Sequence, residues 1–179
     1  MAFEIEKKYR LTIGERERVL KRLHDIDAQF CGEEFEENTL YAGGIIDVKN
    51  CVLRLRRVGG TAFLTYKERF QSSSAIKRQR EDETRVEDAD AMVAILNALG
   101  YRPSVVYEKR RATWRVADTE LVIDELPFGL FMEIEGEEKA IIDTESLLGL
   151  SDLMAEMSTY PQLAVLHGRR VGDLTEARF

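Results

Sequence analysis

The sequence is poor in the residues that build disulfide frameworks and zinc sites. Its 179 residues include two cysteines, Cys31 and Cys51, and two histidines, His24 and His167. Small disulfide-stabilised domains carry many more cysteines, and neither histidine has a cysteine at zinc-ligand spacing. We therefore expect free thiols in a reducing compartment and no zinc.

Long apolar runs and an excess of positive charge are also missing. No stretch of about eighteen apolar residues, the minimum for a membrane-spanning helix, occurs, and the first residues lack the apolar segment of a secretory signal. The formal net charge is −7, which disfavours nucleic-acid binding through bulk charge. These absences predict a cytoplasmic protein without membrane contact and argue against nucleic acid as a partner.

The residues that are present describe a globular chain with a heavy load of charge. Hydrophobic residues make up 44% and charged residues 33% of the sequence. A chain of this length supports one domain with a substantial core. Because no linker, repeat or shift in composition divides it, we predict a single domain over residues 1–179.

Alternation of apolar and polar residues predicts a fold made mostly of strands. Eight strands are expected, over residues 3–11, 33–42, 51–58, 61–68, 76–86, 104–116, 120–126 and 130–137. Helical spacing predicts helices near 13–28 and 89–99, and a helical tail from Asp143 that Pro161 interrupts. Gly59-Gly60 predicts a tight hairpin, and residues 71–74 a polar loop. These elements indicate an α+β protein with an antiparallel sheet.

Charged side chains recur at alternate positions on the expected strands, as in Lys109 and Arg111 or Glu133 and Glu135. Alternate residues of a strand share one face of the sheet, so the simplest explanation is a solvent-facing side. Solvent faces usually mix serine, threonine and glutamine, however, whereas these faces are rich in arginine and glutamate. A closed sheet would turn them into a lumen of both signs, which is costly unless a highly charged ligand and metal ions occupy it.

Eight short segments carry a resemblance to one known family. They are Glu4-Ile5-Glu6-Lys7-Lys8, Leu53-Arg54-Leu55-Arg56, Leu64-Thr65-Tyr66-Lys67, Glu81-Asp82-Glu83, Glu108-Lys109-Arg110-Arg111, Val122-Ile123-Asp124-Glu125, Phe131-Met132-Glu133-Ile134-Glu135 and Thr159-Tyr160-Pro161-Gln162-Leu163. In this order they resemble the motifs of the CYTH superfamily, the triphosphate tunnel metalloenzymes, beginning with its ExExK signature. The resemblance implies an eight-stranded antiparallel, closed or nearly closed β tunnel with helices packed outside.

The same resemblance implies a small-molecule triphosphate substrate and the cofactor Mg²⁺ or Mn²⁺. The basic residues expected to bind phosphates are Lys8, Arg54, Arg56, Lys67, Lys109 and Arg111. The carboxylates expected to bind the metal, as hard oxygen ligands, are Glu4, Glu6, Asp124, Glu133 and Glu135. The expected catalytic residues are Lys8, Glu81 and Glu83. Whether the last two contact a metal or orient the arginines stays open.

One departure concerns Gln79, which stands where the family often has an arginine. A basic contact is therefore absent from the lumen, or is supplied by the neighbouring Arg78 or Arg80. The residues after His167 match no part of the family pattern.

Three functions are compatible with these residues. The first is metal-dependent hydrolysis of inorganic tripolyphosphate, thiamine triphosphate or a nucleotide, which we prefer because it needs only water as nucleophile. The second is a class IV-type adenylyl cyclase, which converts ATP to cyclic AMP and pyrophosphate. The third is a non-catalytic barrel that binds oxyanions or RNA. A homodimer stays an open alternative.

Overall fold

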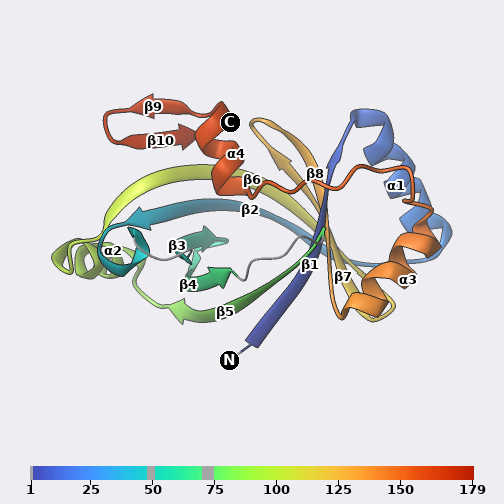
Figure 1. The fold of residues 1–179 in the computed structure, drawn as a ribbon, viewed down its shortest axis with the longest axis horizontal. Coiled ribbons are helices and arrows are strands. Elements are labelled where there is room, and N and C mark those ends of the chain that lie inside the picture. The colour runs from blue at the N-terminus through green and yellow to red at the C-terminus, as the bar shows by residue number, and fades with distance from the viewer. Residues whose placement is uncertain (1, 48–50, 70–74) are drawn as a thin grey trace.

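A closed antiparallel β barrel forms the centre of the computed structural model, which describes residues 2–47, 51–69 and 75–179 (Figure 1). Its eight strands are β1 (Ala2–Leu11), β2 (Gln29–Ala42), β3 (Cys51–Val58), β4 (Thr61–Arg69), β5 (Ile76–Val86), β6 (Arg102–Val116), β7 (Thr119–Leu126) and β8 (Gly129–Glu135). They are arranged in the order β2-β3-β4-β5-β1-β8-β7-β6, and pairing of β2 with β6 closes the ring. The predicted fold class is confirmed. The polar loop expected at 71–74 lies outside the described residues.

The two strands that close the barrel are longer than the sequence predicts. β2 begins at Gln29 rather than residue 33, because the preceding helix ends earlier than expected and Asp27 turns the chain with a φ of 51°. The expected extension of that helix to residue 28 is therefore wrong. The added residues pair with the C-terminal part of β6, where Phe30 lies opposite Trp114. They extend the β2–β6 pairing that closes the barrel.

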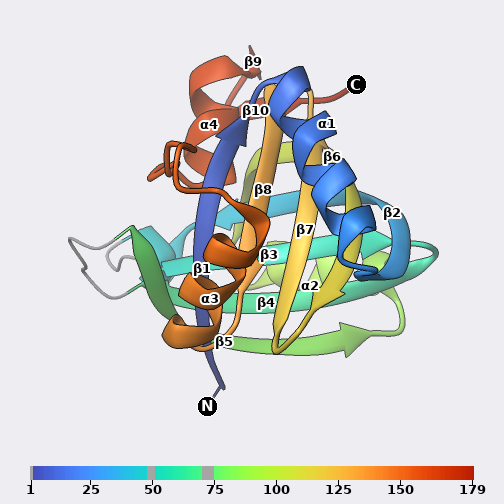
Figure 2. The ribbon, with the colours of Figure 1, turned by 90° about the vertical axis from the view of Figure 1, so that its right-hand side faces the viewer.

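Helices α1 (Ile13–Asp25) and α3 (Glu138–Leu148) cover the outer face of β1, β8 and β7 (Figure 2). The predicted capping box is present at the start of α1, where Thr12 and Glu15 exchange hydrogen bonds. The largest core cluster lies beneath these helices, and its fully buried members include Tyr9, Leu23, Met132, Ile134 and Ile141. Because Ile5, Tyr9 and Leu11 pack on this outer side, the alternate residues Glu4, Glu6 and Lys8 of β1 face the lumen.

Helix α2 (Ala89–Ala98) covers a second part of the barrel, beside β3 and β4 (Figure 1). Asp88 caps its first turn, as predicted, by accepting bonds from the backbone of Asp90 and Ala91. Leu96 packs over Leu55 and other residues of a smaller core cluster. None of the helices in the described ranges is long and apolar enough to cross a bilayer.

The end of the chain differs from the predicted helical tail. Helix α4 (Tyr160–His167) is followed by two short strands, β9 (Arg169–Val171) and β10 (Leu174–Ala177). Pro161 does not interrupt α4 but lies in its first turn, where a missing N–H costs nothing. Strand β10 adds to the barrel in parallel with β6, beside residues 105–107, while β7 pairs with residues 110–116 of the same strand. In the part of the chain that the structure describes, the sheet thus has ten strands, of which eight form the ring.

Candidate functional site

A cavity of about 810 Å³ lies inside the barrel, and most of its walls are charged. The basic side chains that line it are Lys8, Arg54, Arg56, Lys67, Lys77, Arg78, Lys109 and Arg111. The acidic ones are Glu4, Glu6, Glu81, Glu83, Glu120, Glu133 and Glu135. The structure therefore brings together every site residue predicted from the sequence except Asp124, whose carboxylate lies behind the wall.

Asp124 is fully buried and accepts two hydrogen bonds from Arg111. The Arg111 guanidinium donates from Nε to Oδ1 at 2.7 Å and from Nη2 to Oδ2 at 2.6 Å, and Nη2 also lies 2.7 Å from Glu133. This two-point geometry fixes the plane of the guanidinium. A metal-ligand role for Asp124 stays a prediction, whereas its contacts here are those of a residue that orients a cation.

A buried carboxylate missed in the sequence, Glu36 on β2, holds two more of the predicted phosphate-binding residues. Its oxygens lie 3.3 Å from Lys109 Nζ and 3.6 Å from Arg56 Nη1. Burial alone would raise the pKa of Glu36, but the charges of Lys109, Arg111 and Arg56 lower it to about 2. The glutamate is therefore ionised at neutral pH, and its negative charge lies beside Lys109 and Arg56.

On the opposite wall, Lys67 bridges Glu4 at 2.6 Å and Glu81 at 2.7 Å. Gln79 also faces the cavity, and its amide donates to Glu4 at 2.7 Å. Burial and a hydrogen bond with Glu4 raise the pKa of Glu81 to about 7. Burial alone would raise the pKa of Glu4, but Glu81, Lys67 and Gln79 lower it to about 2. The proton that this pair binds near neutral pH therefore lies on Glu81, with the Lys67 ammonium group beside both carboxyls.

Of the two arginines beside Gln79, only Arg78 lines the cavity. Arg80 is paired with Asp82 and Glu68 and does not line the cavity. Arg78 reaches its edge, with its guanidinium 4.6 Å from the centre of the Phe3 ring. The inner face of β5 at position 79 is therefore neutral.

Glu83 lies against the arginines of β3. Its oxygens are 3.0 Å from Arg56 Nη2 and 3.6 Å from Arg54 Nη2, and Thr65 donates to it at 2.7 Å. These contacts favour orientation of the arginines over metal binding for Glu83. The adjacent Arg57 points away from the cavity, 2.6 Å from Asp90, so residues 54–57 do not form one continuous basic patch.

The carboxylates that line the cavity differ in whether they form salt bridges with basic side chains, and those without such a partner are the more available to a metal ion. Glu6, Glu135 and Glu120 lie directly opposite one another on β1, β8 and β7, an unfavourable arrangement for like charges. Burial and the charges of Glu4 and Glu120 raise the pKa of Glu135 to about 7. In the described part of the chain, neither Glu6 nor Glu135 forms a salt bridge.

These donors suit Mg²⁺ or Mn²⁺ in chemistry and in charge, since both ions prefer carboxylate oxygens. Within residues 2–47, 51–69 and 75–179, no three His, Cys, Asp or Glu side chains already converge as a complete ligand set.

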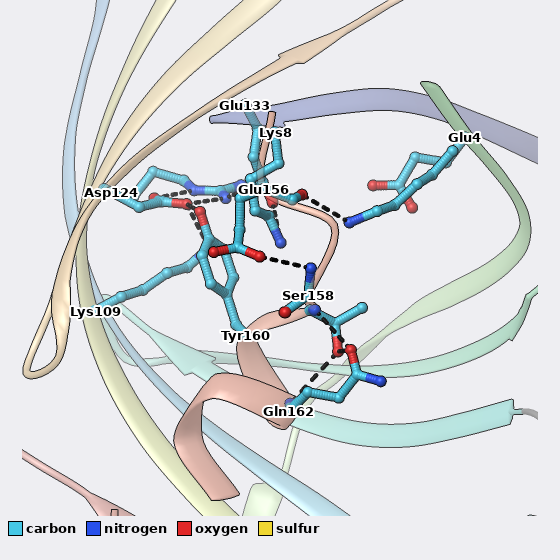
Figure 3. A network of polar contacts seen from close by, with 12 residues as sticks. Glu4, Lys8, Lys109, Asp124, Glu133, Glu156, Ser158, Tyr160 and Gln162 are labelled. Atoms are coloured by element: carbon cyan, nitrogen blue, oxygen red, sulfur yellow. Dashed lines mark hydrogen bonds and ion pairs between the residues drawn. The ribbon is translucent and has the colours of Figure 1, made fainter. Parts of the chain in front are cut away.

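Residues of the C-terminal segment complete the cavity and were not assigned a site role from the sequence. Met157, Thr159, Tyr160, Pro161 and Gln162 line it together with Tyr107 of β6. Figure 3 shows Tyr160 projecting from the start of α4 toward Lys8, Lys109 and Asp124. The signal that could have found this residue is the Thr159–Leu163 segment, whose resemblance to the family was visible although its contacts were not.

The CYTH domain model matches residues 2–150. The chain belongs to the CYTH family. The match covers all eight strands of the ring and ends before α4, so Tyr160 lies outside the matched region.

Individual relatives agree with this assignment. A protein of Methanocaldococcus jannaschii, whose name marks it as a candidate adenylate cyclase, is 28% identical over 148 residues, covering 80% of this chain and 83% of its own length. The PH1012 protein of Pyrococcus horikoshii superposes with a TM-score of 0.78 at 25% identity, over 89% of this chain and 98% of that one. HpAC1 of Hippeastrum, described as having a dominant triphosphatase activity, gives a TM-score of 0.65 over 90% and 94% of the two chains. At 20% identity the last likeness shows the fold alone.

Proposed function

We propose that this CYTH protein binds a triphosphate inside the barrel and hydrolyses it with the help of Mg²⁺ or Mn²⁺. The observation that carries the proposal is the convergence of Lys8, Arg54, Arg56, Lys67, Lys109 and Arg111 on one cavity inside the barrel. Phosphoryl transfer depends mainly on positioning and on neutralisation of charge. Buried and half-buried ammonium and guanidinium groups, held in place by carboxylates, meet the first requirement.

The charge balance of the cavity supports the need for a metal. Eight basic and seven acidic side chains of the described residues line it, and the buried carboxylates of Glu36 and Asp124 lie behind them. A triphosphate adds about four negative charges near neutral pH. Since the walls offer no surplus of positive charge, divalent cations would have to enter with the ligand.

The residues divide into groups with different tasks in this proposal. The Arg111 guanidinium and the lysines of the cavity hold phosphate oxygens. Glu36 and Glu83 keep Arg56 in place. Glu4, Glu6, Glu133 and Glu135 would hold the metal, which when bound neutralises phosphate charge and lowers the pKa of water. Glu81, with a pKa of about 7, suits acceptance of the proton from an attacking water.

Adenylyl cyclase activity is the second candidate, and the size of the cavity favours it. About 810 Å³ lies within the range of pockets that enclose whole organic ligands, roughly 300–1,000 Å³, so a nucleoside has room beside the phosphates. The candidate adenylate cyclase of Methanocaldococcus jannaschii supports the same alternative.

Product analysis separates the two reactions. The protein is incubated with ATP or inorganic tripolyphosphate and Mg²⁺ or Mn²⁺, and kcat/KM is measured for each substrate while cyclic AMP is assayed. Hydrolysis predicts ADP and phosphate from ATP and efficient cleavage of tripolyphosphate. Cyclic AMP and pyrophosphate as the main products, with tripolyphosphate left intact, would establish the cyclase instead.

A further inference from the structure

The C-terminal helix places an aromatic ring among the cations of the barrel. Tyr160, the first residue of α4, is 5% exposed. Lys8 Nζ lies 3.8 Å from the centre of its ring, and Lys109 Nζ lies 5.7 Å from it. Both distances are within the range in which an ammonium group is attracted to an aromatic face.

The ring itself is held firmly from several sides. Its hydroxyl donates to Asp124 Oδ2 at 2.7 Å, and Phe131 packs edge-on at 5.4 Å between ring centres. The next turn of α4, with Leu163 and Ala164, is buried in the same apolar cluster. Before the helix, the Glu156 amide donates to the Lys8 carbonyl at 2.8 Å. The segment before α4 is therefore hydrogen-bonded to β1 four residues before Tyr160.

An aromatic ring differs from a carboxylate in what it does to a buried ammonium group. Among the described residues Lys8 forms one salt bridge, with Glu133 at 3.1 Å, and its ammonium group carries three N–H donors. A second carboxylate at salt-bridge distance would leave a net negative charge at this point of the wall, which would repel a phosphate. The face of a neutral ring attracts the ammonium group without adding another negative charge.

We propose that the Tyr160 ring is a positioning element for Lys8 and Lys109, an inference that rests on the proposed binding of a triphosphate in the cavity. The residue lies beyond the matched residues 2–150, so the segment that lines the cavity at Met157 and Thr159–Gln162 completes the proposed phosphate-binding site. The ring, rather than the hydroxyl, carries the effect, because the ring face is what both ammonium groups approach. Asp124 keeps its two bonds from Arg111 when the hydroxyl is removed.

The test compares three variants of the full chain with the wild type. Tyr160→Phe keeps the ring, Tyr160→Leu removes it, and Tyr41→Leu is the matched control, because Tyr41 is 3% exposed in a different cluster and does not line the cavity. Affinity for inorganic tripolyphosphate in the presence of Mg²⁺ is measured by titration calorimetry. We expect Tyr160→Phe and Tyr41→Leu to bind like the wild type, and Tyr160→Leu to bind about tenfold more weakly.

A second readout does not depend on any ligand. Protons on the terminal methylene of Lys8 lie close to the ring face, so their NMR signals should be shifted upfield in the wild type and in Tyr160→Phe, and should return toward ordinary lysine positions in Tyr160→Leu. If Tyr160→Leu does not fold, Tyr160→Met takes its place, and absence of the shift in the wild type alone overturns the placement.

The outcomes separate this inference from the function on which it rests. Equal losses in Tyr160→Phe and Tyr160→Leu would assign the effect to the hydroxyl and overturn the role of the ring, as would unchanged affinity in Tyr160→Leu. A wild type that binds no tripolyphosphate, although its Lys8 signals are shifted, would refute the proposed function while leaving the ring–lysine geometry intact.

Discussion

Two glutamates of β8 face the same cavity but have different partners. Glu133 lies 3.1 Å from Lys8 and 2.7 Å from Arg111, and these charges hold its pKa far below the usual range although burial opposes this. Glu135, two residues on, forms no salt bridge among the described residues, and its pKa is raised to about 7. The first carboxylate stabilises its neighbours, whereas the second is itself unfavourably placed without a cation.

Removing the charge of Glu135 should therefore stabilise the metal-free protein at high pH. Folding raises its pKa from 4.5 to about 7, so the native state binds the proton more tightly and stability is lost as pH rises through this interval. We expect Glu135→Gln to melt at a higher temperature than the wild type at pH 8 in chelator, and at nearly the same temperature at pH 5. Activity of the variant should require more Mg²⁺. A lower melting temperature at pH 8 would show that the carboxylate is well paired after all.

Glu133→Gln is the matched comparison, with the opposite expected effect on stability. Its loss leaves the buried Lys8 and Arg111 with fewer partners, which costs about 3 kcal/mol for a buried ion pair. We also expect a steep fall in kcat and a changed metal dependence. Denaturant unfolding in chelator measures the first effect, and similar stability changes in the two variants would contradict the distinction between these carboxylates.

Glu36 links stability to acid pH. Its folded pKa of about 2 lies below the ordinary 4.5, so its stabilising contribution is present above about pH 4.5 and is lost as pH falls toward 2. Glu36→Gln should lower the free energy of unfolding by about 3 kcal/mol at pH 7, because Lys109 and Arg56 lose a carboxylate partner. Urea unfolding across this range should show the difference from the wild type shrinking below pH 4. A difference independent of pH would mean that the loss comes from packing.

At the scale of elements, the last strand fastens the end of the chain to the barrel. Arg178, next to β10, lies 2.6 Å from Glu37 on β2 and 2.8 Å from Glu108 on β6. The Phe179 ring lies 4.3 Å from the Arg110 guanidinium. Ala177 is buried in the cluster that also contains Tyr160 and Leu163. The strand thus supports the helix that closes the cavity.

Shortening the chain to end at His167 should weaken both stability and ligand binding. Removal of β9 and β10 exposes Val105 and part of the α4 cluster, and we expect a loss of about 2 kcal/mol in unfolding free energy. Tripolyphosphate affinity should fall as well, because α4 loses its support. Arg178→Ala, the milder control, should cost no more than about 1 kcal/mol. A shortened chain as stable as the full one would show that α4 does not need the hairpin.

The sequence predicts elements well where a pattern is long and local. The alternation in β1 and β3 to β8, the capping box at Thr12 and the hairpin at Gly59-Gly60 all depend on nearby residues. The tail is different. Strands β9 and β10 have three and four residues, too few for a period-2 pattern, and β10 exists because the edge of β6 accepts it. Such pairing depends on tertiary structure.

At the scale of the whole molecule, closure of the sheet decides which charges meet. Motif resemblance assigns twelve residues to what is now a cavity wall, but Glu36 escapes it because charges on β2 occupy both faces, as at Glu36 and Glu37. Tyr160 lies within a resembling segment, but its role in the site is not predicted, because its contacts join residues far apart in the sequence: Lys8, Lys109 and, at a separation of 36, Asp124. Alternation along a strand predicts which face of the sheet a side chain occupies, whereas its contacts with distant residues depend on the fold.

The balance of charge also predicts how activity responds to loss of metal. Because the cavity has nearly equal numbers of basic and acidic groups, a triphosphate without divalent ions would leave several negative charges uncompensated. Turnover should vanish in EDTA and return with Mg²⁺ or Mn²⁺. Phosphate-release assays measure this directly, and full turnover in chelator, or a requirement for zinc, would refute the assignment of the carboxylates.

Neighbouring arginines on β3 offer the most direct test of the claim that the barrel interior is the triphosphate site. Arg56 lines the cavity, whereas Arg57 points outward to Asp90 and Glu37, so the same substitution one residue apart changes opposite sides of the wall. The measurement is tripolyphosphate affinity of Arg56→Ala and Arg57→Ala in Mg²⁺, with folding checked by circular dichroism. We predict that Arg56→Ala loses about 1.5–3 kcal/mol of binding free energy, roughly ten- to a hundredfold, and that Arg57→Ala binds like the wild type. Equal affinities in the two variants would place the ligand elsewhere.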